Sequence, residues 1–153
     1  MYMKRRQVKT EGKNKDNYND VIDIPQSIKM INKKHQLFLS HAYEVARKSN
    51  MLQKHGAVIV YRNEIVASGC NYMCNHLYNN YSIHAEISAI TQMFYNKKLL
   101  ELCDIYVVRI SNTYDNCLRN SKPCKNCSNF IKKYNLRNAY YSTNFICDKL
   151  YIQ

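Results

Sequence analysis

A histidine and a glutamate lie two positions apart in the segment SIHAEISAI, residues 82–90, where an apolar helical pattern begins. Within a helix, residues at i and i+2 point about 200° apart, so His84 and Glu86 make a poor surface pair. One explanation is that they contact opposite sides of one small object, such as a metal ion together with a water that it activates. That explanation requires further ligands from elsewhere in the chain.

Two further ligands are found in the segment SKPCKNC, residues 121–127. Cys124 and Cys127 are spaced i, i+3, so both thiols lie on one side of the first turn of a helix, a common metal half-site. Helix N-termini also stabilise thiolates. One histidine and two thiolates leave the fourth tetrahedral position of Zn²⁺ open, as in catalytic sites, and Glu86 supplies the carboxylate beside it.

Three other interpretations of the same residues stay open. Cys117 could supply a fourth ligand and close a structural zinc site, which leaves Glu86 without a role. Cys124 and Cys127 could form a dithiol redox pair, which leaves His84 without one. The fold could also be kept while catalysis is lost, so that the protein is a binding subunit.

The periodicity of apolar residues predicts the elements that must position these side chains. A helix ending near Asn50 is followed by a hairpin, a helix from His84, a central strand, a helix after Pro123 and a last strand. The core face of the second helix is predicted to carry Ile87, Ile90, Met93 and Phe94. The strands are 56–60, 64–69, 104–110 and 138–143, and 70–83 and 111–122 are predicted to be loops.

This order predicts an α/β fold of three layers, α-β-α, with a mixed sheet of four to five strands and helices on both faces. We expect residues 1–28 to form a flexible basic arm and residues 29–153 to form one domain.

The two motifs together resemble the H-x-E…P-C-x-x-C signature of the zinc deaminases. His84-Ala85-Glu86 lies 40 positions before Cys124, and one predicted strand lies between them. Residues 30–144 resemble the cytidine and deoxycytidylate deaminase superfamily, with HGAVIV and SGCN matching its first strand and the end of its second. A histidine as first ligand is similar to the deoxycytidylate and tRNA-adenosine branches. Those branches usually add a further helix before a parallel last strand, and the ten residues after 138–143 are too few for both. The resemblance therefore implies that the fifth strand is either absent or returns antiparallel, as in the free cytidine deaminases.

The resemblance implies a hydrolytic deaminase that converts the amino group of a cytosine nucleoside or nucleotide to a carbonyl and releases ammonia. Zn²⁺ is the implied cofactor, and Glu86 moves protons to and from the activated water. The implied zinc ligands are His84, Cys124 and Cys127, and the implied substrate contacts are Asn71, Ala85 and Val58. Candidate phosphate contacts are Lys122, Lys125 and Arg119. Candidates for a second, structural zinc are Cys70, Cys74 and His76.

The formal net charge of +12 favours a partner that carries phosphate. A free nucleoside or nucleotide is our first hypothesis. The alternative is a base within nucleic acid, either a tRNA adenosine or a single-strand cytosine, and a non-catalytic structural zinc module is the third. We expect a homo-oligomer. The chain has no apolar run of membrane-spanning length and no signal-peptide core, so we expect an intracellular, cytoplasmic protein without a membrane partner.

Overall fold

The computed structural model describes residues 32–75, 80–111, 117–143 and 147–150. The predicted arm, residues 1–28, lies outside these ranges. The elements in chain order are α2 (Lys33–Arg47), β1 (Lys54–Tyr61), β2 (Glu64–Cys70), β3 (Tyr72–Asn75), β4 (Asn80–Ile83), α3 (Ala85–Thr91), the 3-10 turn η1 (Phe94–Asn96), α4 (Lys97–Leu100), β5 (Asp104–Ile110), β6 (Leu118–Arg119), α5 (Lys125–Lys133), β7 (Asn138–Ser142) and β8 (Cys147–Leu150). The predicted helices and strands are all present in the predicted order.

The main sheet has the strand order β2-β1-β5-β7-β8, and β6 pairs with the end of β5. β1 is antiparallel to both β2 and β5, whereas β5 and β7 are parallel because α5 forms the crossover between them. β8 returns antiparallel to β7. The prediction of a mixed sheet is confirmed, and of the two alternatives for its fifth strand the antiparallel one is present.

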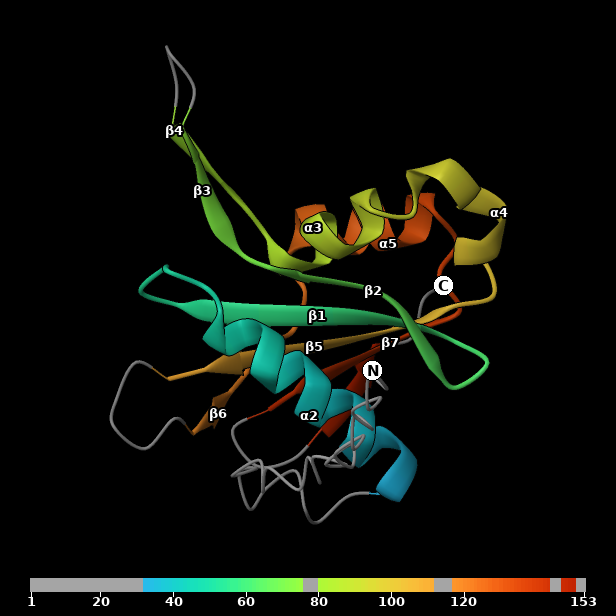
Figure 1. Cartoon of the computed structure of the whole chain (residues 1–153), viewed down its shortest axis with the longest axis horizontal. Coiled ribbons are helices and arrows are strands. Elements are labelled where there is room, and N and C mark those ends of the chain that lie inside the picture. Colours follow the sequence, from blue (N-terminus) through green and yellow to red (C-terminus); the bar gives the residue numbers. More distant parts are fainter. Residues whose placement is uncertain (1–31, 76–79, 112–116, 144–146, 151–153) are drawn as a thin grey trace, which may run out of the picture.

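Helices cover both faces of this sheet, as predicted (Figure 1). α2 packs against one face of β1 and β5, and α3 and α5 pack side by side on the other. Alternate residues of β1 divide the two cores, since Val58 packs toward α2 while Ala57 and Ile59 pack toward α3. None of the helices in the described part of the chain has the length and apolar character needed to cross a membrane.

Two glycines let these helices approach the sheet closely. A Cβ atom on Gly56 would overlap the backbone of Ala42 and Ala46 in α2, and a Cβ atom on Gly69 would lie 2.6 Å from the backbone nitrogen of Ala89 in α3. Neither glycine needs an unusual backbone angle. Their role is to bring helix backbone against strand backbone, which fixes the height of α3 above β2.

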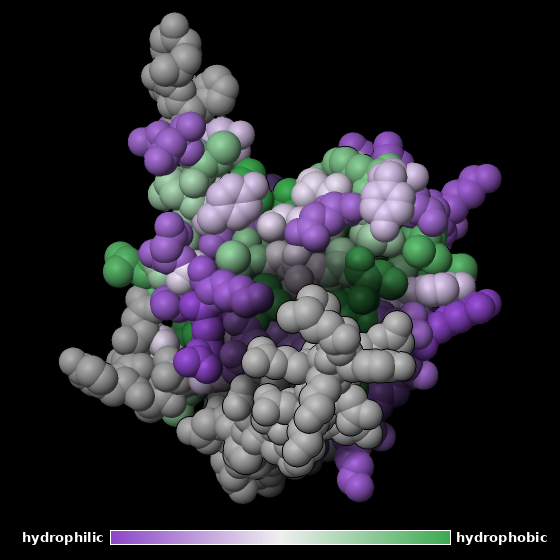
Figure 2. Space-filling view, in the orientation of Figure 1, coloured by the Kyte–Doolittle hydropathy of each residue, from purple (hydrophilic) through white to green (hydrophobic). Residues whose placement is uncertain are grey.

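Residues 70–83, predicted to be a loop, form a second small sheet instead. β3 and β4 pair antiparallel from Tyr72↔Ile83 to Asn75↔Asn80. The two strands extend from the body as a narrow ribbon, and its outermost described residues are hydrophilic (Figure 2). Each strand has only four residues and is mostly exposed, so no alternating apolar pattern marked it in the sequence.

The helix predicted from His84 through Phe94 is shorter than expected. α3 ends at Thr91, and Phe94 lies in the 3-10 turn that follows, 39% exposed. Ile90 and Met93 are buried as predicted. Because the turn changes the direction of the chain, the ring of Phe94 packs 5.1 Å from that of Tyr134 at the end of α5 rather than in the core.

Candidate active site

His84 is the residue immediately before α3 and has an extended backbone, with φ −76° and ψ 154°. It follows β4 directly, so its position is set by a strand on one side and a helix on the other. Its Nδ1 atom lies 3.3 Å from the Sγ atom of Cys127 and 3.7 Å from that of Cys124. The sequence motifs 40 positions apart are therefore brought together.

Cys124 caps the N-terminus of α5, and Cys127 lies on the first turn of that helix. The backbone N–H of Cys127 donates to the Cys124 Sγ atom at 3.5 Å. The prediction placed both cysteines inside the first turn, but Cys124 has extended backbone angles and stands just outside it. Both thiols still face His84, because a cap side chain turns back toward the helix that it begins.

The donor atoms of His84, Cys124 and Cys127 all lie within 4.8 Å of one another. Within the described ranges it is the only group of three or more potential ligands at such distances, and it does not include Cys117. Burial raises the pKa of the Cys127 thiol, and the charges of Glu86 and Cys124 raise it further. A thiolate at this position therefore needs a cation beside it. One imidazole and two thiolates fit Zn²⁺ with an open fourth position.

Glu86 lies on the first turn of α3 and is only 4% exposed. Burial raises the pKa of its carboxyl, while the positive charge of His84 and a hydrogen bond with Cys127 oppose that rise. Glu86 lines the cavity that the metal-binding group borders. A carboxyl in such surroundings can both take up and release a proton during a reaction.

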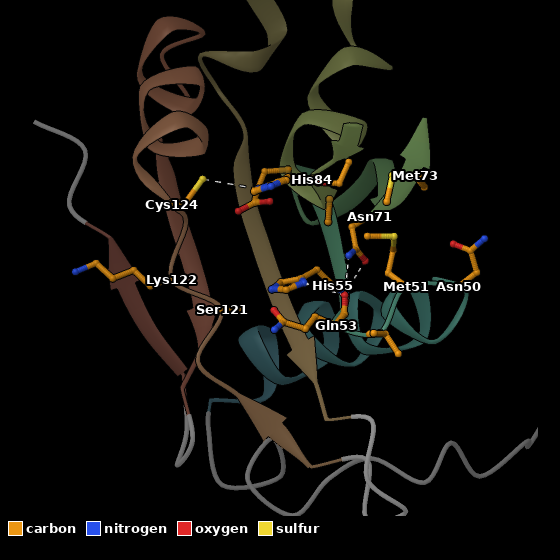
Figure 3. Close-up of a pocket in the computed structure, with 14 residues that line it drawn as sticks. Asn50, Met51, Gln53, His55, Asn71, Met73, His84, Ser121, Lys122 and Cys124 are labelled. Carbon is orange, nitrogen blue, oxygen red and sulfur yellow. Dashed lines mark hydrogen bonds between the residues drawn. The ribbon is translucent and has the colours of Figure 1, made fainter. Parts of the chain in front are cut away.

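A cavity of about 590 Å³ adjoins this group (Figure 3). Of the predicted substrate contacts, Asn71 and Ala85 line it, and so does Lys122 from the predicted phosphate contacts. Sequence reasoning missed most of the wall, which is formed by Asn50, Met51, Leu52, Gln53, His55, Met73, Ser82 and Ser121. No motif marks these residues, because they meet only when the segment before β1, the start of β1, the β3–β4 ribbon and the segment before α5 come together.

Val58, the third predicted substrate contact, does not line the cavity. It is fully buried on the α2 side of the sheet, whereas the cavity lies on the α3 side. Lys125 and Arg119 do not line the cavity either. Of the second zinc site that was predicted, Cys70 ends β2, Cys74 lies on β3, and His76 lies outside the described residues, so that site stays a prediction.

Asn71 joins the two strand ends that form one wall of the cavity. Its Oδ1 atom accepts from the backbone N–H of His55 at 2.8 Å, and its Nδ2 donates to the carbonyl of Gln53 at 2.7 Å. The backbone N–H of Asn71 donates to the carbonyl of His55 at 3.1 Å, and the backbone carbonyl of Asn71 accepts from the Ser49 hydroxyl at 2.8 Å. Asn71 is buried, so these bonds hold residues 53–55 firmly.

A pair of serines fixes the segment that leads to the two cysteines. The Ser121 hydroxyl donates to the carbonyl of Val107 in β5 at 2.8 Å and accepts from the backbone N–H of Ser142 in β7 at 2.9 Å. The backbone N–H of Ser121 donates to the Ser142 carbonyl at 2.8 Å. Both serines are buried. The chain therefore reaches Cys124 from a point anchored to two strands.

Comparison with known proteins agrees with this geometry. Residues 32–143 match the family model of the cytidine and deoxycytidylate deaminase zinc-binding region. A search of curated proteins found no match. Among solved structures the chain is similar to the dCMP deaminase of cyanophage S-TIM5, with 21% identity and a TM-score of 0.57 over 74% of this chain and 86% of that one.

A second similar structure is the cytidine deaminase of Burkholderia pseudomallei, with 16% identity and a TM-score of 0.58 over 77% of this chain and 92% of that one. Identities this low show a shared fold. The family model, in contrast, covers most of the chain and includes His84, Glu86 and both cysteines. This chain belongs to the cytidine and deoxycytidylate deaminase family, whose members bind zinc.

Proposed function

We propose that this protein is a hydrolytic deaminase of a cytosine nucleoside or nucleotide. The observation that carries the proposal is the placement of the buried Glu86 carboxyl beside the His84, Cys124 and Cys127 donor atoms at one end of a cavity. A redox dithiol would have no use for Glu86 and His84. A closed structural zinc site would need a fourth protein ligand, and Cys117 does not join the group.

His84, Cys124 and Cys127 would hold the zinc ion, which supplies the Lewis acidity that makes water a nucleophile near neutral pH. Glu86 accepts a proton from the attacking water and delivers it to the ring nitrogen of the base. Glu86 then takes the proton of the newly added hydroxyl and passes it to the amine, so the carbonyl forms as the C–N bond breaks and the amine leaves as ammonia. Burial raises the pKa of the Glu86 carboxyl, which makes its protonation during this cycle easier.

A small ligand is supported by the shape and charge of the cavity. Lys122 is exposed at the rim of the cavity. Among the described lining residues it is the only lysine or arginine, and one such cation can bind a single phosphate. The S-TIM5 dCMP deaminase has also been solved in complex with dCMP and dUMP, with 20% identity and a TM-score of 0.52 to this chain. A nucleotide with one phosphate, or the corresponding nucleoside, is therefore our first hypothesis.

A base within nucleic acid is the second candidate, favoured by one specific observation. The β3–β4 ribbon stands beside the cavity, with Met73 and Ser82 lining it, and it carries Tyr72 and Tyr81, which are 43% and 50% exposed. Exposed aromatic rings can stack on the bases of a single strand. Together with the +12 charge, the ribbon could hold a polymer whose reactive base enters the cavity.

The experiment that separates these hypotheses measures ammonia release from cytidine, deoxycytidine, dCMP, tRNA and single-stranded DNA at low and high salt. Purified protein should contain about one zinc per chain and act on the small compounds. Activity restricted to the polymers, and falling steeply with salt, would select the second candidate. Absence of ammonia from every substrate would refute the proposed function. The assembly state, predicted to be a homo-oligomer, is measured in the same preparation.

A further inference from the structure

The carboxamide of Asn71, predicted to contact the sugar or base, is used to hold the chain itself. Its Oδ1 accepts from a group that can only donate, the His55 N–H, and its Nδ2 donates to a group that can only accept, the Gln53 carbonyl. The orientation of the amide is therefore fixed by its partners. Asn71 holds the backbone around the cavity-lining residue His55. The side chain of His55 can then contact the substrate in place of the Asn71 amide.

The ring of His55 is half-buried in the cavity wall and has one defined partner. Its Nδ1 atom lies 3.4 Å from the carbonyl oxygen of Gln53. Because a carbonyl only accepts hydrogen bonds, this contact favours the tautomer with the proton on Nδ1, which leaves a lone pair on Nε2 of the neutral ring. Burial lowers the pKa of His55, the bond to Gln53 opposes this, and the positive charges of Arg109 and His84 lower it further.

A lone pair in the wall selects a ligand group that donates a hydrogen bond. The cytosine base has one donor group, the exocyclic amine, and in the proposed reaction that amine must lie at Glu86. The remaining donors of a nucleoside are its sugar hydroxyls. Figure 3 shows His55 between His84 and Gln53, so a ligand whose base lies at the His84 end brings its sugar past the His55 ring.

We propose that His55 is a specificity-determining residue whose Nε2 atom accepts a hydrogen bond from a sugar hydroxyl of the substrate, and that Asn71 is the positioning residue that holds it there. This inference rests on the proposed function for the identity of the ligand. It assigns the sugar to His55 and leaves any phosphate to Lys122, because a neutral acceptor repels a phosphate oxygen.

The first test pairs a side-chain change with a change in the ligand. Wild type, His55→Ala and His55→Gln are assayed with cytidine and with its 2′-, 3′- and 5′-deoxy analogues. In wild type, removal of the hydroxyl that His55 contacts should raise KM roughly tenfold with little change in kcat. In His55→Ala that ratio should fall to about one, and His55→Gln, which can present an acceptor oxygen, should restore part of it.

Two further variants separate recognition from structure. His41→Ala, an exposed histidine on α2, is the matched control and should keep the wild-type ratios. Asn71→Ala should lose the KM ratio between cytidine and the deoxy analogue although His55 is present, because residues 53–55 are no longer held. If Asn71 had a merely structural role, the variant would have a lower kcat or zinc content and an unchanged KM ratio. If no hydroxyl shows a KM ratio that differs between wild type and His55→Ala, the proposal is overturned.

The second test needs no activity. In ¹⁵N-labelled wild-type protein at neutral pH, NMR of the imidazole nitrogens should show His55 as the neutral tautomer with the proton on Nδ1. A proton on Nε2 would overturn the proposal whatever the enzyme does. If His55 has the expected tautomer but no cytosine compound yields ammonia, the proposed function has failed, whereas Nε2 of His55 is still a hydrogen-bond acceptor. Binding of cytidine and uridine is then measured directly. Absence of binding by both would reject a sugar hydroxyl as the ligand of His55.

Discussion

Replacing Gly69 by alanine should disturb catalysis by moving α3. A Cβ atom at this position would lie 2.6 Å from both the backbone nitrogen of Ala89 and the Oγ atom of Ser88. The serine side chain can rotate, but the Ala89 nitrogen is part of the helix. To reach an ordinary contact of 3.4 Å, helix and strand must separate by about 0.8 Å. That separation displaces Glu86, on the first turn of the same seven-residue helix.

The size of the effect follows from that displacement. A misplacement of about 1 Å in a reacting group can cost roughly 100-fold in rate, and overpacking of a core costs about 1–3 kcal/mol of stability. We expect kcat per folded molecule to fall by about 10- to 100-fold in Gly69→Ala. The assay is ammonia release with the preferred substrate, normalised to the folded fraction from chemical denaturation.

Gly56→Ala is the matched control on the other face of the sheet. Its Cβ atom would overlap the backbone of Ala42 and Ala46 even more closely, so the loss of stability should be at least as large. α2 contributes no residue to the cavity wall, so kcat should be retained. The comparison uses kcat because Gly56 neighbours His55, and its replacement can also raise KM. Equal losses of kcat in the two variants, or none in Gly69→Ala, would refute the reasoning.

Three further changes test the site directly. Glu86→Gln should retain zinc and fold but lower kcat by at least about 100- to 10,000-fold, since a single group serves every proton transfer; near-normal ammonia release would contradict this. His84→Ala should lose zinc, measured by elemental analysis, whereas Cys117→Ser should retain it, and the reverse result would favour a closed structural site. Val58→Ala should lower the free energy of unfolding by about 2 kcal/mol in a denaturant titration while leaving KM unchanged; a raised KM would return Val58 to the substrate site.

The predictable part of the fold is the part with strong periodicity. α2, the β1–β2 hairpin and β5 each bury an apolar face or a continuous apolar run, and both patterns are visible in the sequence. The β3–β4 ribbon has no such pattern, because its exposed strands are stabilised by pairing with each other rather than by burial. β6 has only two residues and forms by pairing with the end of β5.

The candidate site divides in the same way. His84, Glu86 and the two cysteines were predictable because metal chemistry demands particular residue types at particular spacings. His55 and Gln53 were not, because nothing in their local sequence indicates that Asn71, more than fifteen positions away, holds them in the cavity wall. The position of Val58 outside the cavity lining has a related reason. A strand match fixes the strand but not which of its two faces meets the ligand.

The Ser121–Ser142 pair has a consequence for the supply of metal. In small zinc modules the ligand-bearing segments are unfolded without the ion, so metal loss is loss of the domain. Here the segment leading to Cys124 is already bonded to β5 and β7 by protein contacts alone. Zinc would then add stability only by mass action, about 2.7 kcal/mol at a hundredfold excess over Kd. We therefore expect the chain to stay folded when zinc is removed, so that deaminase activity should follow the available zinc reversibly.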